Sequence, residues 1–218
     1  MKRTLLLLVL SLLVAGCHFD RGVAGSGIRT KEKRNIGNFT SITTEGAFDI
    51  EVVSQTPASL ELEGDDNLLP LVTTEVTNNV LHIKNSQSYS NRKPIVIKIS
   101  APNLEGLSAN GAGTIQVSGL KNEKFGIDVN GAPKITVSGE TKALQIDANG
   151  AANIDTHRLR ADRAKVGSNG VSKVEVYAIN DLDVTVAGPS TVTYHGNPQV
   201  KQDISGPGSI VKKEPSGS

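Results

Sequence analysis

Apolar and polar residues alternate in short runs through most of this chain. In one stretch Phe125, Ile127 and Val129 alternate with small or polar residues, and beyond a turn Ile135 and Val137 repeat the pattern. Period-two alternation over short runs, bounded by Gly and Asn, is typical of strands with one buried face. The pattern therefore predicts an all-β fold.

The turn between these two runs belongs to a motif that occurs six times. In each copy a glycine is followed four positions later by Ile or Val, and the first four copies have Asn before the glycine. The six glycines are Gly111, Gly131, Gly150, Gly170, Gly188 and Gly206. Their spacing stays close to one constant value along the chain, and a fixed period of about 20 residues indicates a stack of repeats.

Each repeat has room for about three short strand-and-corner units, which suits one coil of a β-helix. Asn-Gly adopts positive φ easily, so we expect it to form sharp corners. A hairpin in each repeat is the alternative. A leucine-rich repeat is rejected, because only residues 104–110 resemble one and the later repeats lack matching leucines. The sequence predicts a single-stranded β-helix, or β-solenoid, with coils of about 18–20 residues over residues 101–213.

Four asparagines hold the same place in successive repeats. In a stack of coils their side chains would lie about 4.8 Å apart, near the spacing of paired strands. Amides at that spacing can hydrogen-bond along the stack, as in the Asn ladders of cross-β structures. We interpret the Asn-Gly positions as a structural corner ladder rather than a binding site. Its asparagines are Asn110, Asn130, Asn149 and Asn169.

Residues 28–100 lack the regular motif and are predicted to form a β-rich cap that includes the first coil or coils. Glu45-Gly46 echoes the corner motif, and residues 73–84 read as a hairpin with its turn at Asn78-Asn79. Repeat proteins need atypical end units to cover the core. At the far end Lys212 and Lys213 precede a short tail, residues 214–218, predicted to be disordered. Charged residues at a terminal strand discourage it from pairing with another chain. If they do not suffice, this open edge is where we expect a homodimer to form.

Residues 1–16 are predicted to be a signal peptide. Lys2 and Arg3 precede an apolar run, and small residues follow before Cys17. This arrangement is typical of a secretory signal and is too short for a membrane span. We expect cleavage between Gly16 and Cys17, and residues 17–27 read as a flexible tether with three glycines.

The residues around Cys17 resemble the lipobox of bacterial lipoproteins. The resemblance implies that Cys17 becomes the first mature residue and carries a diacylglycerol and an N-acyl chain such as palmitate. Several acyl chains hold a protein firmly on a bilayer. The residue after the cysteine is His18 rather than the Asp that retains lipoproteins at the inner membrane, which implies the outer membrane. A conventional signal with an incidental cysteine is the alternative.

Composition narrows the range of partners. Without Lys2 and Arg3 the mature chain has 21 basic and 22 acidic residues, so its net charge is −1. A near-neutral chain gives no electrostatic basis for binding nucleic acid. Cys17 is the only cysteine, so an intrachain disulfide is impossible. The expected partners are a lipid bilayer and an unidentified protein or polysaccharide.

Motifs for catalysis, metals or cofactors are absent from the sequence. The four histidines, His18, His82, His157 and His195, do not fall at metal-ligand spacing, and there is no H-E-x-x-H, C-x-x-C or G-x-S-x-G motif. We therefore expect no metal, no cofactor and no enzymatic activity.

One acidic pair is the weak exception. Asp128 and Asp147 each lie three positions before a corner glycine of consecutive repeats, and Asp203 lies three before Gly206. We interpret them as solvated charges on the outer face. The alternatives are Ca²⁺ ligands or the acid/base pair of a polysaccharide-active β-helix enzyme. Sugar sites favour aromatic platforms, and this chain has no Trp, four Phe and three Tyr.

The motifs together resemble a bacterial family described as putative autotransporter adhesin, head GIN domain. The matching stretches are Phe39 to Val52, Gly64 to Leu69, Thr77 to Ile83 and the six corner motifs, and together they cover residues 34–213. The resemblance implies a secreted or lipid-anchored β-helical protein with no catalytic residues. We therefore expect a non-enzymatic, adhesin-like interaction module of the cell envelope.

Overall fold

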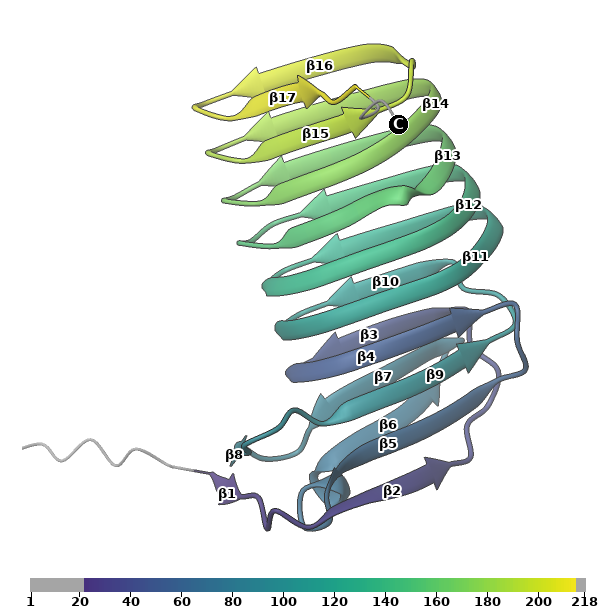
Figure 1. Ribbon diagram of the computed structural model, residues 1–218, viewed down its shortest axis with the longest axis vertical. Helices are drawn as coiled ribbons and strands as arrows, with labels where there is room; N and C mark the ends of the chain where they lie inside the picture. The colour runs from purple at the N-terminus through teal and green to yellow at the C-terminus, as the bar shows by residue number, and fades with distance from the viewer. Residues whose placement is uncertain (1–21, 215–218) are drawn as a thin grey trace, which may run out of the picture.

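The structure of the protein is a computed structural model that describes residues 22–214. It is almost entirely β-strand, and the strands stack into one elongated solenoid (Figure 1). The predicted β-helix is thus confirmed. The signal peptide, Cys17 and residues 215–218 lie outside the described residues. No helix within residues 22–214 is long and apolar enough to span a membrane.

The elements follow one another along the stack. In chain order they are β1 (Val23–Ala24), β2 (Arg29–Arg34), β3 (Ser41–Glu45), β4 (Ala47–Ser54), β5 (Ser59–Asp65), the 3₁₀ helix η1 (Leu69–Leu71), β6 (Val72–Thr77), β7 (Val80–Asn85), β8 (Tyr89–Ser90), β9 (Val96–Ala101), β10 (Gly106–Ala109), β11 (Ala112–Val129), β12 (Ala132–Ala148), β13 (Asn153–Asn169), β14 (Lys173–Ala187), β15 (Thr191–His195), β16 (Gln199–Ser205) and β17 (Ser209–Lys212).

The strands form two sheets that face each other across the core. Sheet 1 contains β2, β5, β9, β4, the first halves of β11 to β14, β15 and β17. Sheet 2 contains β6, β7, β3, β10, the second halves of β11 to β14, and β16. Strands β11 to β14 run through both sheets, and every coil pairs in parallel with the next. This parallel register rules out a hairpin in each repeat.

Each coil has one sharp corner and one broad bend. The corners form a row of points along one side of the stack and the bends form arcs along the other (Figure 1). At the bend the strand continues, but its register shifts, for example between Val117 and Leu120. The expectation of three strand-and-corner units in each repeat is therefore wrong. A coil consists of two straight segments, and irregularities at the bend absorb the variation in repeat length.

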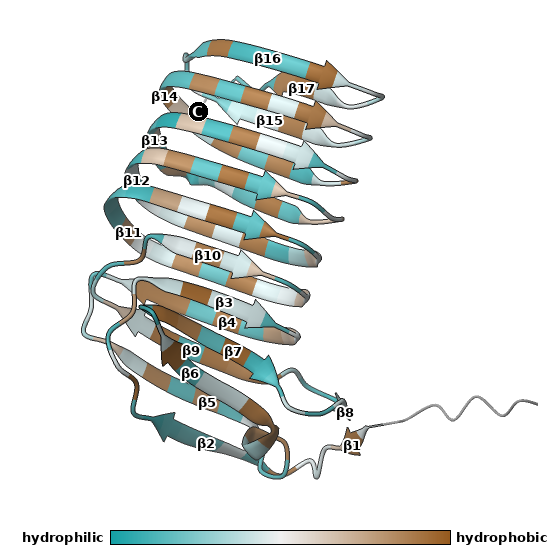
Figure 2. Cartoon of the chain, turned by 180° about the vertical axis from the view of Figure 1, so that it is seen from behind, coloured by the Kyte–Doolittle hydropathy of each residue, from teal (hydrophilic) through white to brown (hydrophobic). Residues whose placement is uncertain are grey.

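The core is a column of alternate side chains from both sheets. In β11 the residues Ile115 and Val117 point inward from sheet 1, and Phe125, Ile127 and Val129 point inward from sheet 2. All five are at most 2% exposed. Figure 2 shows the resulting alternation of hydrophobic and hydrophilic residues along the strands. This is the pattern from which the strands were predicted.

The corner glycines of the first four motifs are required by close packing rather than by positive φ, whereas Gly188 and Gly206 of the last two motifs do have positive φ. A Cβ on Gly131 would lie 2.1 Å from the carbonyl oxygen of Gly111, and one on Gly150 would lie 2.1 Å from that of Gly131. Each of these carbonyls accepts a hydrogen bond from the coil above, as from Ala132 N to Gly111 O at 2.9 Å. Neither Gly131 nor Gly150 is among the glycines with positive φ. The backbone hydrogen bonds between coils therefore continue around the corner, and only a residue without a side chain fits there.

The asparagine ladder is present in part. Asn130 Nδ2 donates to Asn110 Oδ1 at 3.2 Å, and Asn149 Nδ2 donates to Asn130 Oδ1 at 3.5 Å. Asn169 occupies the same corner position but makes no such bond within the described chain. All four side chains are exposed, and exposed hydrogen bonds stabilise a fold only slightly. The glycines therefore contribute more to the corner than the asparagines do.

Buried serines replace this ladder in the later corners. Ser172 Oγ donates to the carbonyl of Gly150, and Ser190 Oγ donates to the carbonyl of Gly170, both at 2.9 Å. Ser172 N in turn donates to Ser190 Oγ at 3.0 Å. These side chains are at most 3% exposed, so they satisfy backbone groups that solvent does not reach.

The cap is inserted between the first coil and the second. Strands β3 and β4 form the first coil around Gly46, the chain then leaves the stack, and it returns as β10. The predicted hairpin is confirmed: β6 and β7 are antiparallel, and Asn78 and Asn79 both have positive φ, as a type I′ turn requires. Arg34 closes the stack at this end, because it reaches from β2 to Leu69 O (2.9 Å) and Thr74 Oγ1 (3.1 Å) at the edge of sheet 2.

We expect Gly131→Ala to destabilise the fold by about 3 kcal/mol, because the added methyl group cannot avoid the backbone of the coil below. The measurement is the free energy of unfolding in urea. Gly126→Ala is the matched control in the same two coils, since a Cβ there would meet nothing closer than 3.9 Å. Equal losses in the two variants would contradict the close-packing explanation.

Candidate functional site

The acidic pair lies on the outer face of sheet 2. Asp128 and Asp147 are register neighbours on β11 and β12, and Gly167 follows them on β13. Each carboxylate accepts a hydrogen bond from a side-chain amide two residues away in the chain: Asn130 Nδ2 to Asp128 at 2.6 Å, and Gln145 Nε2 to Asp147 at 2.7 Å. The two aspartates border a shallow hollow of about 380 Å³. Within residues 22–214 no group of three or more acidic, His or Cys side chains is arranged to hold a metal ion.

A longer groove crosses the same face, which we call the axial groove. Its volume is about 810 Å³, and it runs along the stack beside the bend, from Ser41 on β3 and Glu105 to β16. Its floor follows the inward column of Phe125, Leu144, Ala164 and Leu182. Two of the outward positions beside this column carry little or no side chain, namely Gly126 on β11 and Ala143 on β12.

Both signs of charge line the axial groove. The basic residues are Lys124, Arg163, Lys165 and Lys201, and the acidic residues are Glu105, Asp181 and Asp183. Register places unlike charges on adjacent coils: Arg163 lies beside Asp181, and Asp183 lies between Lys165 and Lys201. A ligand lying along the stack therefore meets a donor or an acceptor at each coil.

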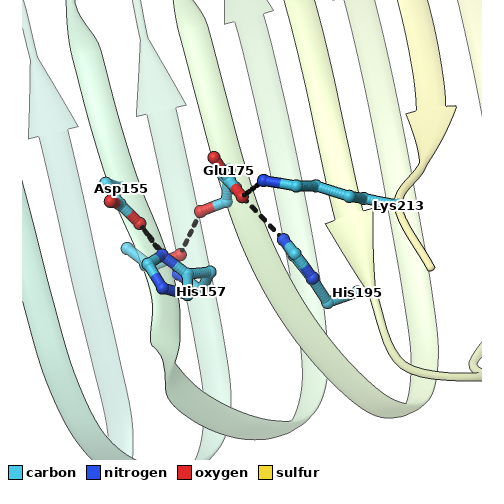
Figure 3. A network of polar contacts seen from close by, with 6 residues as sticks. Asp155, His157, Glu175, His195 and Lys213 are labelled. Carbon is cyan, nitrogen blue, oxygen red and sulfur yellow. Dashed lines mark hydrogen bonds and ion pairs between the residues drawn. The ribbon is translucent and has the colours of Figure 1, made fainter. Parts of the chain in front are cut away.

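A polar group on the opposite face, the histidine cluster, was not predicted from the sequence. It contains Asp155 and His157 on β13, Glu175 on β14, His195 on β15 and Lys213 after β17 (Figure 3). The histidine rings pair with the carboxylates: His157 Nδ1 lies 2.5 Å from Asp155 Oδ1, and His195 Nε2 lies 2.7 Å from Glu175 Oε1.

Aromatic contacts extend the histidine cluster toward the bend. The ring of His195 lies parallel to that of Tyr177, with 6.5 Å between centroids and an interplanar angle of 6°. Arg160 Cζ lies 5.1 Å from the Tyr177 centroid, within the range of a cation–π contact. The rings of His157 and His195 are 5.7 Å apart. Neighbouring coils are thus joined by side chains as well as by the backbone.

Glu175 is the centre of the histidine cluster. Its side chain is 17% exposed, and Lys213 Nζ lies 3.1 Å from Glu175 Oε1. The hydrogen bond with His195 lowers the pKa of Glu175 from 4.5, and Lys213 lowers it further against the opposing effect of burial. Because Lys213 reaches across β15 to β14, the pair ties the last coil to the stack. We interpret the histidine cluster as a structural contact that stabilises the packing of the last coil on the stack.

The repeat period carries the signal that would have located this cluster. Asp155 and Glu175 are register partners on adjacent coils, and so are Tyr177 and His195. A search for metal-ligand spacing among the histidines considers only residues close in sequence and misses such neighbours. A search for polar residues separated by one repeat length finds them.

Comparison with known proteins places the fold. A model of the family described as putative auto-transporter adhesin, head GIN domain, matches residues 38–198, which confirms the resemblance seen in the motifs. Comparison with curated proteins gives no match.

Three solved structures are similar in fold, each over 88% of this chain. They are a putative adhesin from Bacteroides fragilis NCTC 9343 (22% identity, TM-score 0.72, 99% of that chain), a putative lipid binding protein from Parabacteroides distasonis ATCC 8503 (21%, 0.54, 99%) and a putative adhesin from Parabacteroides merdae ATCC 43184 (18%, 0.52, 98%). At these identities the likeness concerns the fold alone.

We expect Glu175→Gln to lower the free energy of unfolding by about 1 kcal/mol at pH 7, because Lys213, its cationic partner, is exposed and solvent screens the pair. The folded pKa is lowered, so this stabilisation is complete above pH 4.5 and is lost as pH falls through the folded pKa. Urea unfolding at pH 7 and pH 3 should therefore show a difference between wild type and variant that shrinks in acid. Glu140→Gln, an exposed glutamate at the bend of β12, is the control. A difference in unfolding free energy between wild type and Glu175→Gln that stays constant with pH would contradict a stabilising role for the ionised Glu175.

Proposed function

Because this chain belongs to the family described as putative auto-transporter adhesin, head GIN domain, we propose that it is a non-enzymatic, adhesin-like interaction module anchored by lipid in the bacterial cell envelope. Its partner lies along the axial groove. The observation that carries the proposal is the continuity of this groove over consecutive coils.

The shape of the groove favours an extended partner. Small-molecule sites are concave and enclose most of their ligand, whereas this groove is open along a flat sheet. Successive coils lie about 4.8 Å apart, so its charged columns repeat at short, regular intervals along the axis. A polysaccharide or an extended polypeptide presents polar groups with comparable regularity. The charged side chains that line the groove supply hydrogen bonds to such a partner.

The chemistry of the face supports binding rather than turnover. Asp128 and Asp147 each accept a hydrogen bond from a side-chain amide two residues away in the chain, and no aromatic side chain lines their hollow among the described residues. Binding needs only that polar groups be matched along the ligand. The polysaccharide-active enzyme remains the alternative function, with these two aspartates as its acid/base pair.

Anchoring through Cys17 would orient the solenoid. Cys17 precedes Val23, the first strand residue, by six positions, and a chain of that length spans at most about 20 Å. The cap would therefore lie near the bilayer, and the open end of the stack would point away from it when the solenoid stands upright. With the lipid attached, this arrangement presents the axial groove beyond the membrane surface, at the outer membrane if His18 directs sorting there.

We expect Arg163→Ala with Lys165→Ala to weaken binding of the partner about a hundredfold, because each of the two lost charged hydrogen bonds costs about 1.5 kcal/mol. Binding of wild type is first screened on arrays of glycans and of extracellular matrix proteins. The affinities of wild type and variants are then measured for each ligand that binds. The control is Lys134→Ala with Lys173→Ala, two exposed lysines on the outer face of sheet 1.

Two outcomes would contradict the proposal. Loss of binding in the sheet 1 control, but not in the groove variant, would place the site on the other face. Shortening of a bound glycan that disappears in Asp128→Ala with Asp147→Ala would show the alternative, enzymatic function.

We expect Cys17→Ala to release the protein from the membrane fraction of its host. Wild type should sediment with membranes, and protease added to intact cells should digest it if the solenoid faces outward. The same treatment after opening the envelope is the control for protease access. Sedimentation of the variant with membranes would contradict lipid anchoring. Protection of wild type in intact cells would contradict surface exposure and place the module inside the envelope.

A further inference from the structure

The C-terminal end of the stack is open. All seven residues of β16 are exposed. Val200 and Ile204 occupy the inward positions that Leu182 and Val186 occupy on β14, yet they are 38% and 41% exposed, against 1% and 0%. Three of the six large hydrophobic residues exposed in the described chain lie on the last two strands, at Val200, Ile204 and Val211.

The backbone of this end is also available for pairing. Within the described chain β16 pairs only with β14, and β17 pairs only with β15, each on one side. The outer sides of both strands therefore present free donors and acceptors, which another strand can use. The opposite end differs, because β2 carries four basic residues on its edge and Arg34 joins the two sheets there.

The sequence of β16 is complementary to itself. When two copies of Gln199–Ser205 lie antiparallel about Gln202, Lys201 of each faces Asp203 of the other. Val200 then faces Ile204, and Gln202 faces its own copy. Opposite charges and apolar pairs facing each other across antiparallel strands stabilise the pairing.

The two adjacent registers are excluded by the same residues. The smallest shift that keeps inward side chains together moves the centre by one residue, to Lys201 or to Asp203. The first would place Lys201 opposite Lys201 and Val200 opposite Gln202. The second would place Asp203 opposite Asp203 and Gln202 opposite Ile204. Each puts like charges face to face. Moving the centre by two residues, to Val200 or to Ile204, avoids like charges but pairs only three residues of β16 and loses both contacts between Lys201 and Asp203. The register centred on Gln202 therefore satisfies the strand best.

We propose that two copies of this chain form a twofold dimer through antiparallel pairing of their β16 strands, centred on Gln202. The interface is isologous, so each favourable contact occurs twice. Pairing shields Val200 and Ile204 from solvent. It also places the inward side-chain amide of Gln202 opposite the same amide of the second copy. Ile210, the half-buried inward residue of β17, adds to the same apolar layer.

The dimer does not extend into a filament, because the other end of the stack is closed. It also joins the two copies of sheet 2 into one sheet. The axial groove includes Gln199, Val200 and Lys201 at its C-terminal end, so the two grooves meet at the interface. This inference rests on the open end and is independent of what the groove binds.

Charge exchange tests the register. Sedimentation of the full chain in detergent should show a dimer. Lys201→Asp alone and Asp203→Lys alone should each weaken it about tenfold, because each creates two repulsive contacts. The combined variant Lys201→Asp with Asp203→Lys should restore wild-type affinity, and Lys134→Asp on sheet 1 should leave it unchanged. A wild type that stays monomeric at about 100 μM, a concentration at which even weak pairs associate, or a combined variant as weak as the single ones, would overturn the proposal.

Cross-linking provides a second measurement that does not depend on charge. In a Cys17→Ala background, Gln202→Cys should form a disulfide-linked dimer under mild oxidation, because side chains at the twofold centre face each other within about 5.5 Å. Lys134→Cys should not. Equal cross-linking at the two positions would overturn the dimer, and cross-linking of Lys201→Cys or Asp203→Cys in preference to Gln202→Cys would overturn the register.

Discussion

The stacking of backbone directly upon backbone at the corners is the constraint on which the rest of this structure depends. The Ala132 amide donates to the carbonyl of Gly111 one coil below, and the glycine at the corner lets the two chains approach closely enough. The corner therefore fixes where each coil starts. Coils of unequal length keep a common register because the irregularities lie at the opposite side, in the bend, as between Thr136 and Ser138.

Because the corners align the coils, residues one repeat apart become neighbours on a flat outer face. Lys165, Asp183 and Lys201 form one such column, with one residue contributed by each of three successive coils. The chemistry of such a surface is set by which residue types occupy each column of equivalent positions. Most outward positions that line the axial groove are charged, with Gly126 and Ala143 as small residues among them, so each column contributes its own chemistry to this face.

The sequence was sufficient for features that repeat and insufficient for those that do not. The glycine period and the alternation of Ile and Val predicted the solenoid, and Asn78-Asn79 predicted the hairpin of the cap. The prediction of positive φ at Gly131 was wrong, because close approach of coils is visible only once they are stacked. The contact of Arg160 with Tyr177 follows a register shift at the bend, which no fixed period reveals. The acidic pair was placed correctly as adjacent, but its hydrogen bonds with Asn130 and Gln145 depend on rotamers.

The two ends of the stack are treated differently, and this asymmetry decides how copies can meet. Antiparallel strands and Arg34 close the N-terminal end, so pairing at β16 joins two C-terminal ends and leaves the two caps far apart. The chain from Cys17 to Val23 reaches at most about 20 Å. Two lipid-anchored copies that stand upright can therefore pair only across facing membranes, whereas a pair on one membrane must lie flat.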